Sequence, residues 1–363
     1  MTKTYQQILE QIDAIDPVAY AKTRNHLSGA VTKLSPYITR GVITLPAIRD
    51  RLLERHSSKD CEKLIQELAW REYFQNVWWE KGDEIFADLR FERDDWRHDG
   101  LVTSLVDGTT GVEVLDAGIQ ELYETGYMHN HLRMWVASVS CNLAKAHWHN
   151  MGKWLYYHLH DGDLASNFLS WQWVAGTSKS TPYTMNQKLI NGCGDVNQVR
   201  SMLTYDRDRM LDQPLPEVLE AQQSFDLQAT YPEVPKLDSV AGATVCLYTP
   251  WTLDPTWQSD ELARRILVID PAWFDRFPVS VSVMDFIVEQ GRMVIDGLEI
   301  FVGQPGDLPG FAQAGGAAAR HHQTCTHWPA SIEFDETPKL FPHVSRYYKS
   351  FMAYWKAAEK SQR

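Results

Sequence analysis

The sequence predicts a mainly α-helical protein in which a helical domain, residues 1–235, is followed by a smaller α/β domain, residues 236–363. Up to about residue 205, apolar residues recur at helical spacing and strand signals are sparse. Residues 206–240 are rich in Pro, Asp, Glu and Gln, as expected for a long connection. From about residue 241, short β-rich apolar runs alternate with a helical pattern, which is typical of a parallel sheet.

Three helices are well marked in the first part of the chain. The first, over residues 61–79, carries two stripes at helical spacing. One stripe is Leu64, Ile65 and Leu68, and the other is Glu67, Trp70, Arg71, Phe74 and Trp78. We expect a second helix over residues 112–124. A third is expected over residues 129–149, where apolar residues again follow the helical period.

The C-terminal part reads as strands, one helix, a loop and a final helix. The runs TVCLYTPW (244–251) and RILVIDPAWF (265–274) predict strands that end at proline, and LEIFVG (298–303) predicts a third. The segment 284–290 predicts a helix between them. Residues 303–319 are rich in Gly and Ala and predict a flexible loop, while residues 345–360 predict an aromatic amphipathic helix.

Composition limits the class of protein. With 44% apolar and 23% charged residues the chain can build a large core, which excludes wholesale disorder. No apolar window is long enough for a membrane helix, and the polar first 16 residues do not predict a signal peptide. Five scattered cysteines without a CxxC favour a reducing cytoplasm. The net charge of −12 argues against indiscriminate nucleic-acid binding but allows a local basic groove.

Four ordered motifs carry a resemblance to a known family. They are Y…R…TKLSPY (20–37), ELAWRE (67–72), GVEVLDAGIQELYETGYMHN (111–130), and DGDLASN with WQW (161–173). In this order and spacing they resemble the FAD-binding domain of the photolyase/cryptochrome family, over roughly residues 20–185. The resemblance implies a helical FAD-binding domain of photolyase type, with FAD as cofactor and no Rossmann fingerprint.

The resemblance also implies residues that bind FAD. Tyr20, Thr32 and Ser35, with the adjoining Lys33 and Leu34, match the segment that grips the phosphates, since hydroxyls suit a pyrophosphate. Arg133 and Asp161 match an ion pair over the flavin ring, and Asp163 matches a contact with the flavin edge or the adenine. Asn130 and Asn167 match positions around the flavin ring, where Asn167 faces flavin N5. From the residues alone, Ser35 reads as a helix N-cap with Pro36 at the first helical position, and Asn167 as a helix cap.

Other matched positions imply a substrate site and an electron-transfer chain. Glu67, Trp70 and Trp173 match a pocket for a flipped-out damaged dinucleotide. Arg24 and Arg71 match phosphate-facing positions, and Met134 matches a residue typical of enzymes acting on cyclobutane dimers. Trp171, Trp148 and Trp96 match the tryptophans that conduct an electron to FAD, although Trp96 fits only with a one-residue slip. On the residues alone, Trp70 also reads as an ordinary core aromatic.

The chain departs from the family pattern in three places. His131 stands where the family often has Arg, and residues 184–191 replace a stretch that normally carries Arg, so two DNA contacts are missing. The N-terminal α/β antenna domain is absent from its usual place. The runs after residue 241 resemble it, which suggests a circular permutation, with an unrelated α/β unit as the alternative.

These observations predict blue-light repair of cyclobutane pyrimidine dimers by electron transfer from reduced FAD, with UV-damaged DNA, single-stranded DNA included, as partner. The alternatives are a cryptochrome-like photoreceptor without repair activity and a flavin-binding interaction protein. The antenna chromophore and the oligomeric state stay open. No metal site is expected, because HHQTCTH (321–327) reads as a polar loop.

Overall fold

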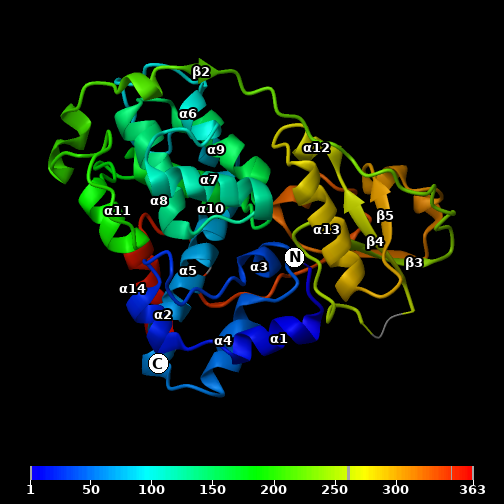
Figure 1. Cartoon of the computed structure of the whole chain (residues 1–363). Coiled ribbons are helices and arrows are strands. Elements are labelled where there is room, and N and C mark those ends of the chain that lie inside the picture. The colour runs from blue at the N-terminus through cyan, green and yellow to red at the C-terminus, as the bar shows by residue number, and fades with distance from the viewer. Residues whose placement is uncertain (1, 260–261, 345, 362–363) are drawn as a thin grey trace.

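The structure, a computed structural model, describes residues 2–259, 262–344 and 346–361. A helical array lies beside a parallel five-stranded sheet (Figure 1), which confirms the predicted fold class. The helices of the array are α1 (Tyr5–Asp13), α2 (Pro17–Thr23), α3 (Ser35–Thr39), α4 (Leu45–Leu53), α5 (Ser58–Lys81), α6 (Thr103–Val106), α7 (Glu113–Thr125), α8 (Asn130–Ser138), α9 (Trp148–His158), α10 (Leu164–Ala175) and α11 (Gln187–Gly194). None of the described helices is long and apolar enough to cross a membrane.

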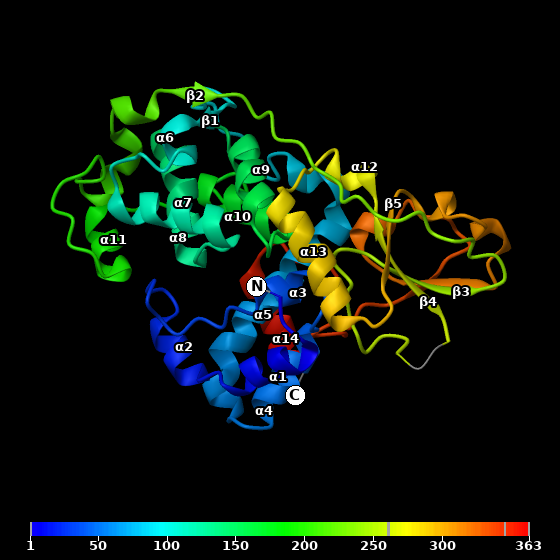
Figure 2. The same ribbon diagram turned by 45° about the vertical axis from the view of Figure 1, so that its right-hand side comes forward.

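Helix α5 is the central element of the array. It begins where the Ser57 hydroxyl accepts a hydrogen bond from the Asp60 backbone N–H at 3.2 Å, and it ends at Gly82, whose positive φ of 54° suits glycine. The helix predicted over residues 61–79 is therefore confirmed, with additional turns at both ends. Helices α2, α4, α10 and the C-terminal α14 (Phe351–Ser361) pack against α5, so α5 can present side chains to several neighbours (Figure 2).

The single helix predicted over residues 129–149 is wrong, because two helices meet there. Helix α8 passes into a π-helical turn, Val139–Leu143, and Lys145 then adopts a positive φ of 58°. Ala146 forms an isolated bridge with His98, and the His147 side chain accepts a hydrogen bond from the His149 backbone N–H at 3.2 Å. This capping starts α9, and the apolar periodicity continues across the break, which conceals it from sequence analysis.

The sheet is parallel throughout and has the order β5-β4-β3-β6-β7. Its strands are β3 (Thr244–Tyr248), β4 (Arg264–Ile269), β5 (Glu299–Val302), β6 (Gly316–Arg320) and β7 (Glu333–Asp335). The three predicted strands are confirmed, and α13 (Val281–Val294) contains the predicted helix, while α12 (Pro271–Phe274) follows β4. The predicted flexible loop over residues 303–319 is wrong at its end, since residues 316–319 pair with Thr244–Leu247 of β3. Backbone pairing in the sheet overrides the low strand propensity of Gly and Ala.

The predicted long connection over residues 206–240 holds little regular structure. Strand β2 (Gln222–Gln223) pairs antiparallel with β1 (Leu101–Val102) and joins the connection to the helical array.

Short 3-10 turns occur both within this connection and elsewhere in the described chain. They lie at Gly82–Phe86, Arg207–Asp212, Glu217–Leu219, Pro305–Asp307, Phe311–Gln313 and Gln323–Cys325.

The apolar core of the helical array continues onto one face of the sheet. Cys246, Tyr248, Leu267 and Ile269 belong to the same buried cluster as the helices, and alternate residues of β3 and β4 belong to a second, smaller cluster on the opposite face. Helix α13 lies between the sheet and α9 (Figure 1). The sheet is therefore packed firmly against the helices.

The C-terminal segment returns to the helical array. The predicted helix is confirmed as α14, although it starts at Phe351, and residue 345 lies outside the described residues. The Glu72 carboxylate of α5 is buried and accepts hydrogen bonds from the backbone N–H of Leu340, from that of Phe341 at 2.9 Å and from the Tyr354 hydroxyl at 2.7 Å. This carboxylate anchors the C-terminal segment to α5.

Candidate functional site

Two buried aspartates precede α10. Asp163 is the N-cap of α10, where it accepts a hydrogen bond from the Ser166 backbone N–H at 2.8 Å. It also accepts from Gln75 Nε2 at 2.6 Å and lies 3.3 Å from Arg71 Nη2, so it fixes α10 to α5. The predicted role of Asp163 at the cofactor edge stays a prediction.

Asp161 and Arg133 form a buried ion pair, as the resemblance implies. Arg133 Nη2 lies 2.9 and 2.8 Å from the two carboxylate oxygens of Asp161, and Arg133 Nε donates to the Met128 carbonyl at 2.9 Å. Burial opposes ionisation of Asp161, but Arg133 and a hydrogen bond with the Ser35 side chain outweigh it and lower the pKa of this carboxyl. The pair is therefore held ionised inside the protein.

Ser35 differs from the simple N-cap reading of the sequence. It is the first residue of α3, and Leu34 occupies the N-cap position without a side-chain cap. The Ser35 side chain hydrogen-bonds Asp161 instead, and Thr39 Oγ1 donates to the Asp161 backbone carbonyl at 3.0 Å. The segment that contains Ser35 and the segment before α10 are thus joined at Asp161.

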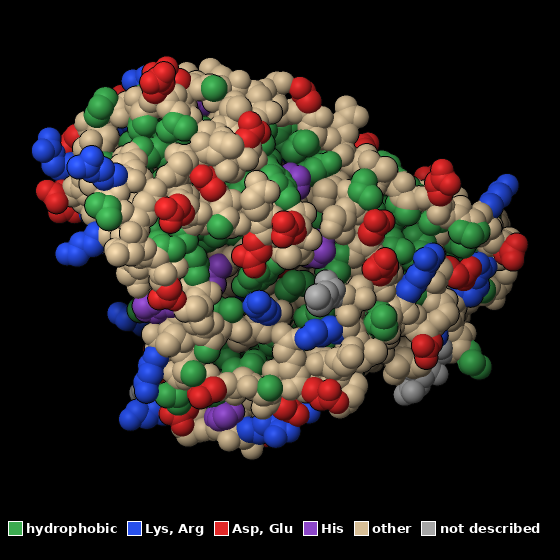
Figure 3. Space-filling view, viewed as in Figure 1, with side chains coloured by type: hydrophobic (Ala, Val, Ile, Leu, Met, Phe, Trp, Pro, Cys, Tyr) green, Lys and Arg blue, Asp and Glu red, His purple; other side chains and the backbone are tan. Residues whose placement is uncertain are grey.

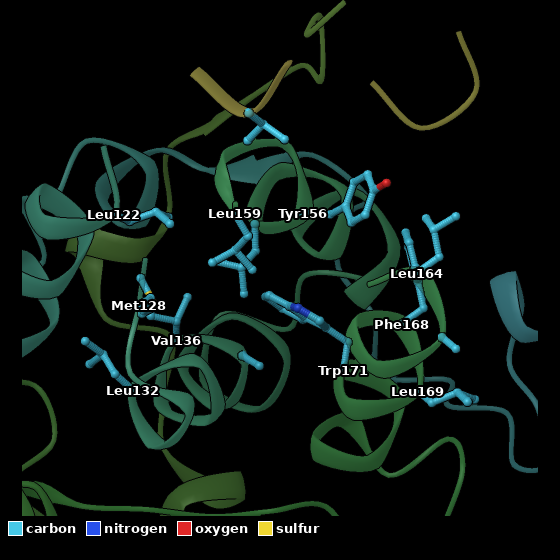
Figure 4. Packing of buried hydrophobic residues seen from close by; sticks show 14 of the residues in the cluster. Leu122, Met128, Leu132, Val136, Tyr156, Leu159, Leu164, Phe168, Leu169 and Trp171 are labelled. Atoms are coloured by element: carbon cyan, nitrogen blue, oxygen red, sulfur yellow. The ribbon is translucent and has the colours of Figure 1, made fainter. Parts of the chain in front are cut away.

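Asn167 lies inside α10, so it is not a helix cap. Its side chain is buried and donates from Nδ2 to the Gly152 carbonyl of α9 at 2.9 Å. Trp171 follows one turn later and points from α10 into the apolar core, toward Leu159 (Figure 4). A Cβ at Gly152 would lie 3.4 Å from Trp171 Cγ, which is ordinary van der Waals contact, so the backbone of α9 at Gly152 borders the Trp171 ring.

Several cationic groups gather beside the Arg133–Asp161 pair. Burial and the nearby His131, Arg133 and Lys33 lower the pKa of His129 to about 4. The buried His129 Nε2 has no hydrogen-bond partner among the described residues. Burial, then the charge of Glu67, raises the pKa of Tyr20. The charge of Lys33 and the buried ring nitrogen of the neutral His129 suit the pyrophosphate of FAD, so these residues fit that cofactor.

The remaining phosphate-segment residues also lie near this cluster. Lys33 has a positive φ of 51°, and its Nζ lies 5.7 Å from the centre of the Tyr127 ring. The Thr32 carbonyl accepts a hydrogen bond from Gln11 Nε2 at 2.6 Å. Asn130 is the first residue of α8 and is exposed.

Glu67, predicted to line the substrate pocket, and Arg24, predicted to face a phosphate, are brought together, a contact that the sequence analysis did not predict. Arg24 Nε lies 3.3 Å from Glu67 Oε1, and Lys63 Nζ lies 2.8 Å from the same oxygen. The Glu67 side chain remains 31% exposed, so its carboxylate is held in place and still accessible. Arg71, by contrast, is paired with Asp163, which favours a structural role, and its contact with DNA stays a prediction.

Trp70 contacts the C-terminal helix. Its ring stacks on Phe351 of α14, with centroids 3.8 Å apart and planes inclined by 11°, and it also contacts Tyr73 and Phe74. One face of Trp70 is thus covered by the chain itself. No local sequence pattern signals this pairing, because the two residues are 281 positions apart in the chain.

Trp173, Met134 and His131 lie on α10 and α8. Trp173 contacts Tyr183 at 5.8 Å between centroids, and Lys179 Nζ lies only 3.3 Å from the centre of the Trp173 ring. His131 hydrogen-bonds the Asn25 carbonyl through Nδ1 at 2.8 Å and contacts the Tyr183 hydroxyl at 3.3 Å. Met134 is half-buried. Sequence reasoning missed Lys179 and Tyr183, which follow the WQW motif directly.

The predicted electron-transfer tryptophans are connected through α9. Trp148 is fully buried, one turn before Gly152, whose Cα borders Trp171. The His147 ring lies 5.4 Å from that of Trp148 and 5.1 Å from that of Trp96. Trp96 is half-buried rather than fully exposed, and the Arg93 guanidinium lies 4.2 Å from the centre of its ring.

A cavity of about 140 Å³ lies between α5 and the C-terminal ends of β3 and β6. Three of its lining residues have buried donors without a partner among the described residues, namely Asn76 Nδ2, Trp251 Nε1 and Arg320 Nε. His322 also lines the cavity and stacks on Trp251, with the ring planes inclined by 3°. The sequence analysis did not predict this cavity, since helical and sheet residues form it together.

No set of three His, Cys, Asp or Glu suited to a metal occurs among the described residues.

The buried ion pair, the amide of Asn167 and the neighbouring cations define a helical flavoprotein. The sequence profile for the FAD binding domain of DNA photolyase matches residues 64–261, more than half of the chain. The chain belongs to the photolyase/cryptochrome family, and FAD is the cofactor of its helical domain.

Curated relatives carry both family names. A deoxyribodipyrimidine photo-lyase of Streptomyces griseus is 32% identical over 176 residues, which is 48% of this chain and 38% of that protein. A cryptochrome DASH of Natronomonas pharaonis is 34% identical over 172 residues, which is 45% of this chain and 36% of that protein. The chain therefore matches these relatives over less than half of their length. A solved Synechocystis cryptochrome is 26% identical, with a TM-score of 0.49 over 53% of this chain and 44% of that one.

Proposed function

We propose that the protein repairs cyclobutane pyrimidine dimers in DNA under blue light. The observation that carries this proposal is the accessible carboxylate of Glu67, held by Arg24 and Lys63 three residues before the aromatic ring of Trp70. When bound in its reduced form, FAD supplies one electron under light, which the split pyrimidines return. The reaction then needs from the protein a pocket that orients the dimer and excludes water.

The chain's own residues supply that pocket in this proposal. Glu67 accepts a hydrogen bond from the edge of a pyrimidine, while Trp173 and the free side of Trp70 hold the flipped bases by stacking. Met134 adds an apolar contact. Arg24 lies beside Glu67 and contacts a backbone phosphate.

The surface charge suggests where DNA approaches. Acidic side chains are spread over the face in Figure 3, and Lys and Arg side chains gather at the edge where α11 and the following residues lie. The exposed cations of this stretch are Lys188, Arg200, Arg207 and Arg209. They follow the WQW motif and offer individual cations where the family's usual Arg residues are missing, although the stretch carries as many exposed aspartates, Asp195, Asp206, Asp208 and Asp212. A short or single-stranded substrate fits the overall charge of −12, because unstacking costs less there.

A second candidate function is light reception without repair. Phe351 of α14 covers one face of Trp70, so the pocket is joined to a C-terminal helix that could relay a change at the flavin. This reading predicts light-dependent change in association or proteolysis with no dimer splitting.

We further propose residues 236–363 as the permuted antenna domain, following residues 1–235 as FAD-binding domain. The cavity with the unpaired donors of Asn76, Trp251 and Arg320 is the place where a second chromophore would bind. Absorption spectra of the purified protein before and after Trp251→Ala, which removes one aromatic wall, test this assignment. No disulfide joins the five cysteines, all of which the structure describes, and this suits the cytoplasm that we propose as the protein's location.

The decisive experiment uses purified, photoreduced protein with thymine-dimer oligonucleotides, single- and double-stranded. Blue light should restore the ultraviolet absorbance of the thymines, and a dark control should not. Glu67→Ala should lower the rate by roughly 10²-fold if its hydrogen bond acts in the reaction. Glu62→Ala, at an exposed position on the same helix, should leave the rate unchanged. A protein that photoreduces but restores no thymine would refute the repair function and favour light reception.

A further inference from the structure

Trp148 has an unusual partner for a buried tryptophan. Its indole Nε1–H donates to the carboxylate of Asp88 at 2.6 Å, which is short for a bond from an N–H to an oxygen. The ring itself is fully buried, and the Asp88 side chain is only 18% exposed. A neutral indole does not release its proton, but an indole that has lost one electron is a strong acid.

Trp96, the next tryptophan outward, has the opposite surroundings. Its buried Nε1 has no hydrogen-bond partner among the described residues. The Arg93 guanidinium lies 4.2 Å from the centre of its ring, and the Asp95 carboxylate that pairs with Arg93 also binds Lys145. A cation over the ring opposes removal of an electron, and no described acceptor can take the indole proton.

His147 links the two sites. Its ring lies between those of Trp148 and Trp96, and Nε2 lies 3.9 Å from Asp88 Oδ1. Burial lowers the pKa of His147, although Asp88 and Asp99 oppose this shift, so the ring is neutral near neutral pH. Because His147 Nδ1 accepts a hydrogen bond from the His149 backbone N–H, the ring proton is on Nε2, which faces Asp88 and favours its ionised form.

We propose that Asp88 is the proton acceptor for Trp148, and that oxidation of this chain stops at Trp148 as a neutral radical rather than at Trp96 as a cation. The inference rests on the proposed light-driven function and on the tryptophan chain that the resemblance implies: FAD, when bound in its oxidised form, would accept an electron under light, and Trp171 is the residue that would give it up. One electron then moves from Trp148 to the oxidised Trp171, which becomes a neutral indole again. The Nε1 proton of Trp148 moves to Asp88, leaving a neutral indolyl radical and a protonated carboxyl. Return of the electron then requires return of the proton, which slows recombination.

The test is transient absorption and electron paramagnetic resonance of the FAD-loaded full chain after a light flash. These spectra distinguish a neutral tryptophan radical from a cation radical. The wild type and Trp96→Phe should both form the neutral radical. Asp88→Asn keeps the size and a hydrogen-bond acceptor but is a far weaker base, and should give a cation radical that recombines about tenfold faster. Deuterated water should slow formation of the neutral radical in the wild type and in Trp96→Phe, but should not affect the radical of Asp88→Asn.

Two further variants separate the possible failures. Asp99→Asn removes a carboxylate that acts on His147 but does not accept the Nε1–H hydrogen bond of Trp148, and this variant should behave as wild type. The role of Asp88 would be overturned if Asp88→Asn and Asp99→Asn changed the type and lifetime of the radical equally. It would also be overturned if Asp88→Asn still formed a neutral radical of unchanged lifetime. Trp148→Phe should abolish the long-lived radical. If that radical persists in Trp148→Phe, the electron route itself is wrong, whatever the dimer-repair assay shows.

Discussion

The ring of Phe351 in the C-terminal helix stacks on the ring of Trp70 in α5, with centroids 3.8 Å apart. Phe351 also contacts Tyr73 and Trp355, so one aromatic cluster joins the candidate pocket to the end of the chain. The shape of the pocket on this side is consequently set by a helix that follows the sheet.

Phe351→Ala should destabilise the protein and loosen the pocket. The side chain is 3% exposed, and removing a buried Phe costs about 3–5 kcal/mol, because a cavity remains. Urea unfolding should show this loss in the free energy of unfolding. Met352→Ala, next to it and 54% exposed, is the matched control and should change stability by no more than about 0.5 kcal/mol. If both variants lost the same free energy of unfolding, the loss would come from helix propensity and not from the stacking of Phe351.

Glu72→Ala should release the C-terminal segment. The substitution leaves the buried backbone N–H groups of Leu340 and Phe341 and the Tyr354 hydroxyl without their acceptor, at a cost of about 3 kcal/mol or more. Limited proteolysis should then cleave near residue 345 faster than in the wild type. Glu72→Gln retains one acceptor oxygen, so it should lose less stability than Glu72→Ala and be cleaved more slowly. Glu80 is exposed on the same helix, and Glu80→Ala should leave the cleavage rate unchanged. If Glu72→Ala is also cleaved at the wild-type rate, Glu72 does not anchor the C-terminal segment.

Asp161→Asn should weaken FAD binding. The amide cannot balance the charge of Arg133, so a buried cation is left uncompensated beside the cofactor site. We expect at least about tenfold weaker binding, measured as the flavin-to-protein absorbance ratio after dialysis and by titration with FAD. Asp94→Asn, at an exposed position, is the control. Full flavin retention in Asp161→Asn would contradict the assignment of this pair.

Acid should destabilise the fold through half-buried histidines such as His322. Burial, opposed by the charge of Asp163, lowers the pKa of His322 to about 4 in the folded state, against about 6.5 in an unfolded chain. The unfolded state therefore binds the proton first, and stability present above about pH 6.5 is lost as the pH falls toward 4. His322→Gln should show a smaller loss between pH 7 and pH 5 in urea midpoints. An identical pH dependence would exclude His322 as a contributor.

Local patterns predicted much of this structure correctly. Helix α5 follows from the two stripes on residues 61–79, and β3 and β4 follow from apolar runs that end at Pro250 and at Asp270–Pro271. The pairing of Arg133 with Asp161 was implied by the matched motifs, whereas the pairing of Arg24 with Glu67 was not predicted. The predicted helix and strands each show a pattern within a short stretch of residues.

The features that escaped prediction depend on distant residues. The break before α9 comes from the pairing of Ala146 with His98, and β6 exists because Ala317 and its neighbours pair with β3. No local pattern signals that Phe351 covers Trp70, or that Arg320 and Asn76 line one cavity. Tertiary contacts decide these features, and a single sequence does not record them.

The hydrogen bond from the Leu340 backbone N–H to Glu72 spans 268 positions of the chain. At a typical rate of about 5–20 residues per second, a ribosome needs roughly 15–50 s to make the partner of this carboxylate after making Glu72 itself. During that interval the nascent helical part carries an acid that is destined for burial and an uncovered aromatic face at Trp70. Synthesis of this protein should therefore depend on chaperones that hold the growing chain until its last segment emerges.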